Sequence, residues 1–435
     1  MPKVLIIGNG AREHALAWAI ARSPLASEVL CAPGNAGTGR IARNVPVAAS
    51  DLPGLEQLAL AEEVDLTVVG PELPLVLGLA DRLRQQGLAV VGPDRLAARL
   101  EGSKAFAKQL MAEANVPTAP WQVHERFATA RDHILRADRP LVVKADGLAG
   151  GKGSVVCSTP EQALAAAEAM LVHGLHGEAG RRVIVEERLS GSELSLIALT
   201  DGRTILPWPC CRDYKRLEEG DRGPNTGGMG AISPAPGCAG LTGRLVRTIM
   251  QPMLAALGVA GISYRGFLYA GLILTAQGPQ VLEFNCRPGD PETQVQLMRL
   301  RGDLVPALLA AARGTLAPQL LSWDERPAAC VVLAVGGYPG LAAGGERLDA
   351  LTSWEDRGGV VVFLGATERL QGRLVARGGR VACVTARAES PSEARQLALD
   401  VAEQLAWPGA RFRRDIGILH AASAPSELAC SSGGG

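Results

Sequence analysis

The chain has 435 residues, of which 47% are hydrophobic and 20% are charged, and this length predicts about three domains. Its 44 basic and 44 acidic residues cancel, and no long run of one charge occurs. This balance argues against a nucleic-acid-binding or membrane-surface protein and favours a small charged metabolite as the partner.

Nine cysteines are scattered without C-x-x-C spacing, which argues against a zinc site or a disulfide framework and indicates reduced, mostly buried thiols. The N-terminus leads directly into an apolar strand at Lys3–Ile7, without the pattern of a signal peptide. No apolar run approaches the ~18 residues of a membrane span. We therefore expect a soluble, cytoplasmic protein, and a monomer.

The first hundred residues alternate short apolar strands with helical segments. Such a rhythm predicts a doubly wound parallel sheet, the N-terminal α/β substrate domain 1–101. Gly-rich turns at 8–10, 33–37, 70–72 and 92–94 follow the strands, and ligands bind beyond the carboxyl ends of strands in such sheets. The expected elements are strands at Val4–Ile7, Glu28–Cys31, Leu66–Val69 and Ala89–Val91 and a helix at Glu13–Arg22.

The first turn, Gly8-Asn9-Gly10, begins like a dinucleotide-binding fingerprint. Its sixth position is Glu13 rather than glycine or alanine, and the acidic residue expected about 20 positions later is absent. NAD binding is therefore disfavoured. Two interpretations remain open, a phosphate monoester held by backbone N–H groups at a helix N-terminus and a plain tight turn.

Residues 102–190 form a second unit, with strands at Leu141–Lys144 and Val183–Glu187 and a helix at Glu161–Leu171. A Gly-rich loop with a lysine, 147–153, follows the first strand without Walker A spacing. Glycines admit phosphates close to the backbone, so the loop is either a phosphate lid or an ordinary hairpin. The acids Glu186 and Glu187 are either a solvated strand end or a hinge that contacts adenine, with Glu193 reaching the ribose.

The third unit, 191–315, has strands at Leu194–Leu199, Phe267–Leu274 and Gln280–Asn285 and a helix at Asp303–Ala312. Side chains alternate along a strand, so Glu283 and Asn285 share one face. Mg²⁺ prefers such oxygen ligands and is commonly held by one or two carboxylates together with nucleotide phosphates. A long polar connection, 213–230, precedes the next helix and is either functional or disordered.

A boundary at 316–327 precedes a strand-rich C-terminal domain, 328–422, in which no catalytic constellation is recognised. Its helix begins with a capping box at Ser390 and Glu393. The tail 423–435 is of low complexity and is expected to be disordered. The strands are expected at Cys330–Ala334, Val360–Phe363 and Arg380–Thr385, and the helix is expected to bury Ala394, Leu397, Ala398, Val401 and Leu405.

Taken in order, these motifs resemble those of ATP-grasp ligases, and among them the phosphoribosylamine-glycine ligase family. The resemblance covers about residues 1–420, and its most specific segments are Gly223–Gly230 and Gly289–Gln294. It implies the α/β ATP-grasp fold, with lid and central subdomains at 102–190 and 191–315. It also implies that ATP, with Mg²⁺ or Mn²⁺, drives the joining of glycine to 5-phosphoribosylamine through glycyl phosphate in purine biosynthesis.

The resemblance also implies roles for single residues. Arg287 would stabilise the acyl phosphate, Asp213 would hold the glycine ammonium, and Lys215 would act beside them. Glu283 and Asn285 would bind the metal, without the further acid that many ATP-grasp enzymes carry on the preceding strand. ATP would contact Lys104, Lys144, Gly150, Gly151, Lys152, Gly153, Glu186, Glu187, Leu189 and Glu193. The substrates would contact Gly8, Asn9, Gly10, Asn35, Pro71, Glu72, Asn225, Thr226, Gly227, Gly228 and Met229.

Three rival functions predict different chemistry. Another ATP-grasp carboxylase or transferase would use a different acid, and the segment Asn225–Gly230 disfavours it. A Rossmann oxidoreductase would bind nicotinamide, which the altered first turn disfavours. A nucleotide sensor would bind ATP without consuming it.

Overall fold

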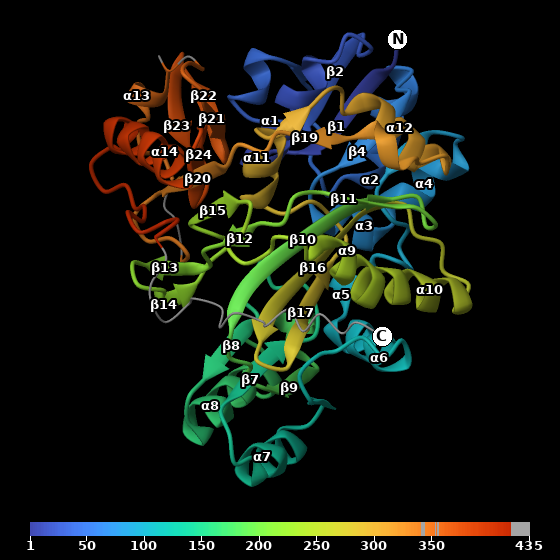
Figure 1. Cartoon of the computed structure of the whole chain (residues 1–435), viewed down its shortest axis with the longest axis vertical. Coiled ribbons are helices and arrows are strands. Elements are labelled where there is room, and N and C mark those ends of the chain that lie inside the picture. The colour runs from blue at the N-terminus through green and yellow to red at the C-terminus, as the bar shows by residue number, and fades with distance from the viewer. Residues whose placement is uncertain (341–343, 353, 355, 419–435) are drawn as a thin grey trace, which may run out of the picture.

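A computed structural model describes residues 1–340, 344–352, 354 and 356–418. Cys430 and the tail 423–435 lie outside these residues. In Figure 1 the N-terminal domain lies at the top, the C-terminal domain lies beside it, and the long strands of the central subdomain run down to the lid subdomain.

The N-terminal sheet is parallel, with strand order β3-β2-β1-β4-β5, as the sequence predicts. Val4–Ile7 are fully buried because helices cover both faces, so the central strand is apolar throughout rather than alternating. The strands are β1 (Lys3–Gly8), β2 (Glu28–Pro33), β3 (Arg43–Asn44), β4 (Leu66–Val69) and β5 (Ala89–Val91). The helices are α1 (Ala11–Ala21), α2 (Leu52–Ala61), α3 (Glu72–Leu77), α4 (Leu79–Gln85), α5 (Arg99–Gly102) and α6 (Lys104–Glu113).

The lid subdomain contains an antiparallel sheet of order β6-β9-β7-β8. Its apolar residues, such as Val143 and Ile134, form a hydrophobic cluster separate from those of the body. The sequence predicted two of these strands and one of these helices. The elements are β6 (Trp121–His124), β7 (Leu141–Ala145), β8 (Ser154–Cys157), β9 (Val183–Glu187), α7 (Phe127–Arg136) and α8 (Pro160–Leu171).

The central sheet is antiparallel, of order β11-β10-β16-β17, and its three predicted strands are confirmed. It shares a hydrophobic cluster with the N-terminal domain, in which Leu5, Leu196 and Leu268 take part. The strands are β10 (Ser192–Thr200), β11 (Ile205–Pro207), β16 (Gly266–Thr275) and β17 (Gly278–Asn285). The helices are α9 (Thr242–Leu245), α10 (Gln251–Val259), α11 (Glu292–Leu297) and α12 (Val305–Arg313).

The C-terminal sheet, of order β12-β15-β20-β24-β21, pairs strands from both sides of the predicted boundary at 316–327. The capping box of α14 (Pro391–Leu405) is confirmed, but Leu397 is 37% exposed and Leu399 is buried instead. The other members are β12 (Arg212–Asp213), β15 (Gly230–Ser233), β20 (Ala328–Ala334), β21 (Val360–Leu364) and β24 (Arg380–Arg387). Shorter elements are β13 (Arg216–Glu218), β14 (Arg222–Asn225), β18 (Leu300–Arg301), β19 (Ser322–Trp323), β22 (Thr367–Leu370), β23 (Arg373–Ala376) and α13 (Asp349–Thr352).

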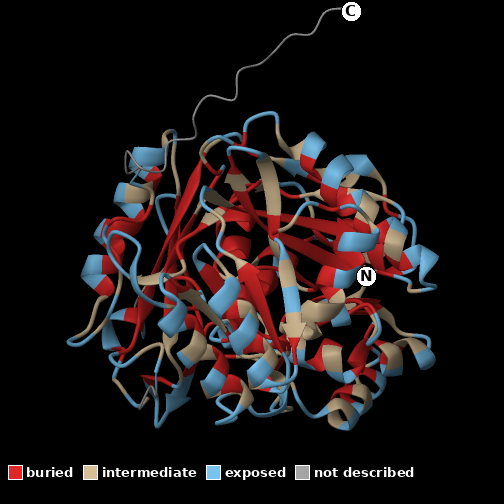
Figure 2. Ribbon diagram, turned by 90° about the horizontal axis from the view of Figure 1, so that it is seen from below, coloured by how far each residue is buried: buried red, intermediate tan, exposed pale blue. Residues whose placement is uncertain are grey.

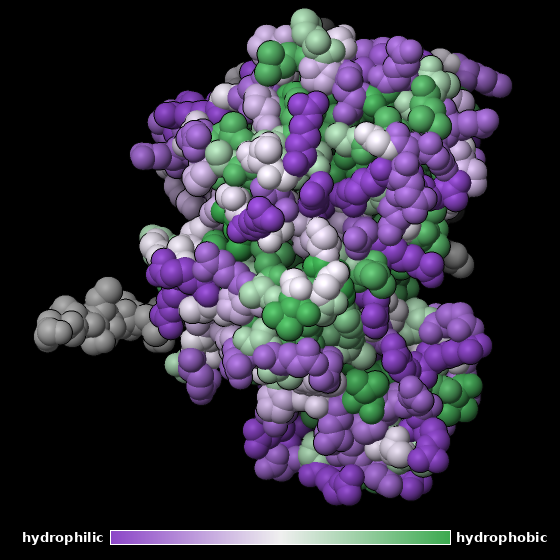
Figure 3. Space-filling model, turned by 90° about the vertical axis from the view of Figure 1, so that its right-hand side faces the viewer, coloured by the Kyte–Doolittle hydropathy of each residue, from purple (hydrophilic) through white to green (hydrophobic). Residues whose placement is uncertain are grey.

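Burial follows the layers: strands are mostly buried and helices expose their outer faces (Figure 2). The face in Figure 3 intersperses hydrophilic and hydrophobic residues. The cysteines within the described ranges are unpaired and buried, which confirms the expectation of reduced thiols there. Among the described residues, no helix combines the length and apolar character needed to cross a bilayer.

Candidate active site

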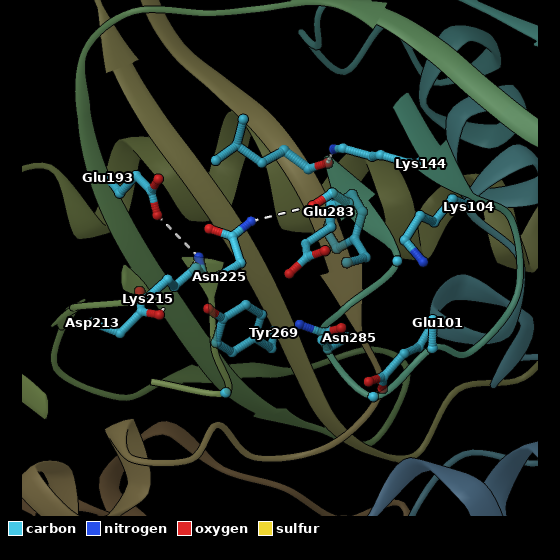
Figure 4. A pocket seen from close by; sticks show the side chains of 18 of the residues that line it. Glu101, Lys104, Lys144, Glu193, Asp213, Lys215, Asn225, Tyr269, Glu283 and Asn285 are labelled. Carbon is cyan, nitrogen blue, oxygen red and sulfur yellow. Dashed lines mark hydrogen bonds and ion pairs between the residues drawn. The ribbon is translucent and has the colours of Figure 1, made fainter. Parts of the chain in front are cut away.

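One cleft of about 850 Å³ lies where the N-terminal, lid, central and C-terminal regions meet. Figure 4 shows polar side chains from several of these regions converging there. Of the residues predicted for the site, the cleft is lined by Asn9, Gly10, Pro71, Glu72, Lys104, Lys144, Gly150, Gly151, Gly153, Glu186, Glu187, Leu189, Glu193, Asp213, Lys215, Asn225, Thr226, Gly227, Glu283, Asn285 and Arg287.

Five predicted residues do not line this cleft: Gly8, Asn35, Lys152, Gly228 and Met229. Asn35 is buried, and its amide nitrogen donates to the carbonyls of Asn9 (2.9 Å) and Leu364 (2.8 Å). Met229 is fully buried. These two side chains therefore join or fill the walls behind the cleft.

Glu283 stands at the centre of the cleft, with Lys104 and Lys144 on one side and Asn225 on the other (Figure 4). Within the described ranges, its carboxylate has neither a hydrogen bond nor an ion pair to another residue. Burial would raise the pKa of Glu283, but surrounding cations outweigh burial and lower it. Those cations are Lys215, Lys144, Lys104 and Arg287.

Asn285 lies two residues further along β17 and is 9% exposed. Assigned from its hydrogen-bonding surroundings, its amide nitrogen donates to Oε1 of Glu101 (3.1 Å) and to the Phe284 carbonyl (3.2 Å). Its amide oxygen is then left without either of these partners. Glu283 and Asn285 thus supply two neighbouring oxygen donors, as a light Mg²⁺ shell requires.

A buried ion network links the lid subdomain to β17. Oε1 of Glu186 lies 2.5 Å from Nζ of Lys144, and its Oε2 lies 2.5 Å from Nζ of Lys108. Lys144 also donates to the Leu282 carbonyl at 3.0 Å. Burial lowers the pKa of Lys108 to about 8, although Glu186 opposes that shift. The network fixes Lys144 beside Glu283.

A second charged group comes from β10 and the connection 213–230. Nζ of Lys215 lies 3.1 Å from Oε2 of Glu193 and 3.6 Å from Oδ2 of Asp213. Burial raises the pKa of Asp213 to about 7 against the opposing charge of Lys215, and Glu292 and Glu193 raise it further. Asp213 therefore exchanges a proton near neutral pH.

Arg287 is held by two carboxylates from the N-terminal side. Its Nε lies 3.2 Å from Oε2 of Glu72, and its terminal nitrogen lies 2.9 Å from Oε1 of Glu101. Oε2 of Glu101 also accepts the backbone N–H of Cys286 at 2.9 Å. Glu101 therefore positions both Arg287 and Asn285, a task that the sequence analysis did not predict.

The first turn is shaped by Glu13. Its Oε2 accepts the backbone N–H of Gly10 at 2.6 Å, and Arg12 contacts its Oε1 at 2.6 Å. A Cβ on Gly8, Gly10 or Gly70 would lie 2.7, 2.7 or 2.0 Å from the Glu13 side chain. The glycines of these turns therefore make room for a carboxylate of the protein itself.

We expect Gly70→Ala to destabilise the protein by about 1–3 kcal/mol, because the new methyl group would displace Glu13 from the Gly10 N–H. Urea unfolding measures the change. Gly258→Ala is the control, since a Cβ there meets nothing within 4 Å and the site is in a helix, where alanine is favoured. Equal effects of the two substitutions would contradict the packing argument.

Arg380, from the C-terminal domain, lines part of the cleft. Its guanidinium donates to the carbonyls of Gly227 and Asp290, both at 2.7 Å, while the Gly227 N–H donates to the Tyr338 hydroxyl at 2.9 Å. No sequence pattern indicates these contacts, because they join residues 90, 111 and 153 positions apart. Other cleft residues that were not predicted are Arg12, Glu13, Glu101, Lys108, Tyr269, Asp290 and Glu292.

Comparison with known proteins assigns the family. Models of the N, ATP-grasp (A) and C domains of phosphoribosylglycinamide synthetase match residues 2–101, 102–293 and 328–419. The phosphoribosylamine-glycine ligase of Yersinia pestis is 46% identical over 418 residues, covering 95% of this chain and 98% of that protein. The chain belongs to the phosphoribosylamine-glycine ligase family.

Other comparisons agree with this assignment. The phosphoribosylamine-glycine ligase of Allochromatium vinosum is 48% identical over 422 residues, covering 95% of this chain and 98% of that protein. The Thermotoga maritima enzyme of this family superimposes with a TM-score of 0.83 at 34% identity, covering 95% of this chain and all of that one. A biotin carboxylase domain from Hydrogenobacter thermophilus, at TM-score 0.73 and 16% identity over 94% and 91% of the two chains, shares the fold alone. The predicted ATP-grasp fold is confirmed.

Proposed function

We propose that this chain joins glycine to 5-phosphoribosylamine with ATP, giving glycinamide ribonucleotide, ADP and phosphate through glycyl phosphate. The observation that carries the proposal is the unpaired carboxylate of Glu283, beside Asn285 and among four cations. Membership of the phosphoribosylamine-glycine ligase family supports the choice of substrates. The role belongs to purine biosynthesis.

The donor set suits Mg²⁺, and Mn²⁺, which accepts the same oxygen ligands, is an alternative. Glu283 is ionised because its pKa is lowered, and Glu101 fixes the amide of Asn285. No cluster of three or more His, Cys, Asp or Glu side chains suited to a metal occurs in the described part of the chain. When bound between these donors and the nucleotide, the metal would neutralise charge on the phosphate oxygens.

The basic residues of the cleft make glycine reactive. A carboxylate is a poor acyl donor, so the γ-phosphoryl group of ATP must first pass to glycine. Lys104 and Lys144 lie beside Glu283, where they would stabilise the charge spread over the transferring oxygens. Arg287 would then stabilise the acyl phosphate, and the Gly150–Gly153 loop, with Lys152, would exclude water.

The remaining cleft residues would bind glycine, the nucleoside part of ATP and phosphoribosylamine. Asp213 and Lys215 would orient glycine, while Glu186–Leu189 and Glu193 would contact adenine and ribose. Asn9, Gly10, Pro71, Glu72 and Asn225–Gly227 would hold phosphoribosylamine, and Gly8, Asn35, Gly228 and Met229 would support them from behind the cleft lining. We further propose that the enzyme acts as a cytoplasmic monomer, with the four subdomains bounded as the sequence predicts.

The test is an ADP-release assay with purified protein, Mg²⁺, ATP, glycine and phosphoribosylamine. Omission of either glycine or phosphoribosylamine should reduce the rate to background, and glycinamide ribonucleotide should form in proportion to ADP. Release of ADP that depends on neither substrate would contradict the proposal.

A further inference from the structure

Four polar side chains, those of Ser195, Asp213, Tyr269 and Glu292, meet in the wall of the cleft. Oγ of Ser195, on β10, lies 3.3 Å from Oδ1 of Asp213, 3.2 Å from Oε1 of Glu292 and 2.9 Å from Oη of Tyr269. Ser195, Tyr269 and Glu292 are at most 3% exposed. None of these three was predicted to take part in the site.

The hydroxyl groups of this cluster carry too few hydrogens to make every contact at Oγ of Ser195 a hydrogen bond. Three contacts surround Oγ of Ser195, but Ser195 and Tyr269 together supply only two hydrogens. Asp213 and Glu292 therefore compete for the serine proton unless one of the carboxyl groups is itself protonated. A protonated Asp213 would supply the third hydrogen, and burial raises its pKa to about 7.

Apart from Glu283, the other carboxylates that line the cleft each have an ion pair with a basic residue. Glu283 lies among four cations, and Glu186 contacts two lysines. Within the described ranges, Glu292 has no hydrogen bond or ion pair except the one from Ser195. The remaining pairs are Glu13 with Arg12, Glu72 and Glu101 with Arg287, Glu187 with Arg139, Glu193 with Lys215, Asp221 with Arg413, and Asp290 with Arg380.

We infer that Asp213 and Glu292, bridged by Ser195, form the proton acceptor for the amine that attacks the acyl phosphate. This inference rests on the proposed function. As the C–N bond forms, the C–O bond to phosphate breaks, phosphate leaves with the electron pair, and the surplus proton of the nitrogen passes to the carboxylate pair. Ser195 and Tyr269 are positioning residues.

The charges around Asp213 set its titration. The pKa of Asp213 is raised to about 7, chiefly by burial, so its carboxylate is the form above neutral pH. The same form suits the ammonium of glycine, so both tasks require Asp213 to lose its proton. The groups that face the pair are Lys215, Glu193, Tyr269, Cys211, Arg287 and Arg380.

The experiment compares wild type and Glu292→Gln in steady-state kinetics from pH 6 to 9, with all substrates saturating. Wild-type kcat should rise through an apparent pKa near 7. In Glu292→Gln we expect kcat to fall by about 100-fold. The rise of kcat with pH that remains in this variant should move to lower pH, because the Glu292 charge raises the pKa of Asp213 in the wild type.

Ser195 provides a second test if Glu292→Gln does not fold. Ser195→Ala should lower kcat by about tenfold and shift the pH at which kcat rises. Ser195→Thr should restore both the kcat value and its pH profile. Glu161→Gln, in the first turn of α8 and outside the cleft lining, is the matched control and should change neither.

The outcomes separate the two proposals. An active wild type with Glu292→Gln and Ser195→Ala both within twofold in kcat, and with an unchanged pH profile, would overturn the proton acceptor and leave the ligase function intact. A folded wild type that releases no ADP with glycine and phosphoribosylamine would overturn the function itself.

Discussion

Glu283→Ala should lower kcat by about 1,000-fold, equivalent to about 4 kcal/mol of transition-state stabilisation, while the protein stays folded. The carboxylate is unpaired among the described residues and lies among Lys104, Lys144, Lys215 and Arg287. Its removal would take away the carboxylate that we propose binds the metal, and it would leave these cations to repel one another. Rapid-quench kinetics would measure the loss in the rate of ADP formation. Titration with a nonhydrolysable ATP analogue in Mg²⁺ would measure the loss in nucleotide affinity.

Two variants sharpen this result. Glu283→Gln keeps the shape and removes only the charge, so it should lose nearly as much activity as the alanine variant. Gln280→Ala lies on the same strand but does not line the cleft, and its activity should be unchanged. Activity of Glu283→Ala within tenfold of wild type would contradict the metal assignment.

The fold was predictable wherever the hydrophobic residues of the sequence form a clear pattern. Continuous apolar runs such as Val4–Ile7 and Leu66–Val69 mark strands buried on both faces, and their parallel order follows from the intervening helices. Trp121–His124 was missed because an apolar and polar alternation over only four residues is a weak signal, and only His124 is buried. The prediction that Leu397 is buried was wrong, because Leu399 lies on the buried face of α14 instead.

The site was predictable where one short segment carries two of its parts. Glu283 and Asn285 share a strand face, so the period of two brings them together without knowledge of the fold. Glu101 and Arg380 could not be placed in this way. Each acts on residues that lie about 90 to 190 positions away along the chain, and only tertiary packing decides such contacts.

The first turn left two interpretations open, a phosphate-binding turn and a plain tight turn. Gly8 and Gly10 suggested backbone approach to a phosphate, but the structure places the Glu13 side chain against both glycines. Glu13 at the sixth position was the signal, because a carboxylate three residues into a helix can cap the turn that precedes it. The Gly10 N–H is therefore already occupied by the protein.

Glu186→Gln should destabilise the protein by about 3–5 kcal/mol, because it leaves two buried ammonium groups without their counter-charge. Lys108→Met should cost far less, since Lys144 still pairs with Glu186. Urea unfolding at pH 7 would give both values. Equal losses in the two variants would show that Glu186 does not balance both lysines.

The pH dependence of unfolding provides an independent check on Lys108. Its folded pKa of about 8 lies below its ordinary value of 10.5, so the unfolded chain binds more protons between these values. The contribution of Lys108 to stability should therefore rise as pH increases from about 8 to 10.5. The stability of wild type relative to Lys108→Met should improve over that range, and a difference that stays flat would contradict burial as the cause. Because Glu186 pairs with Lys144, which also donates to the Leu282 carbonyl, the same network keeps Lys144 beside Glu283.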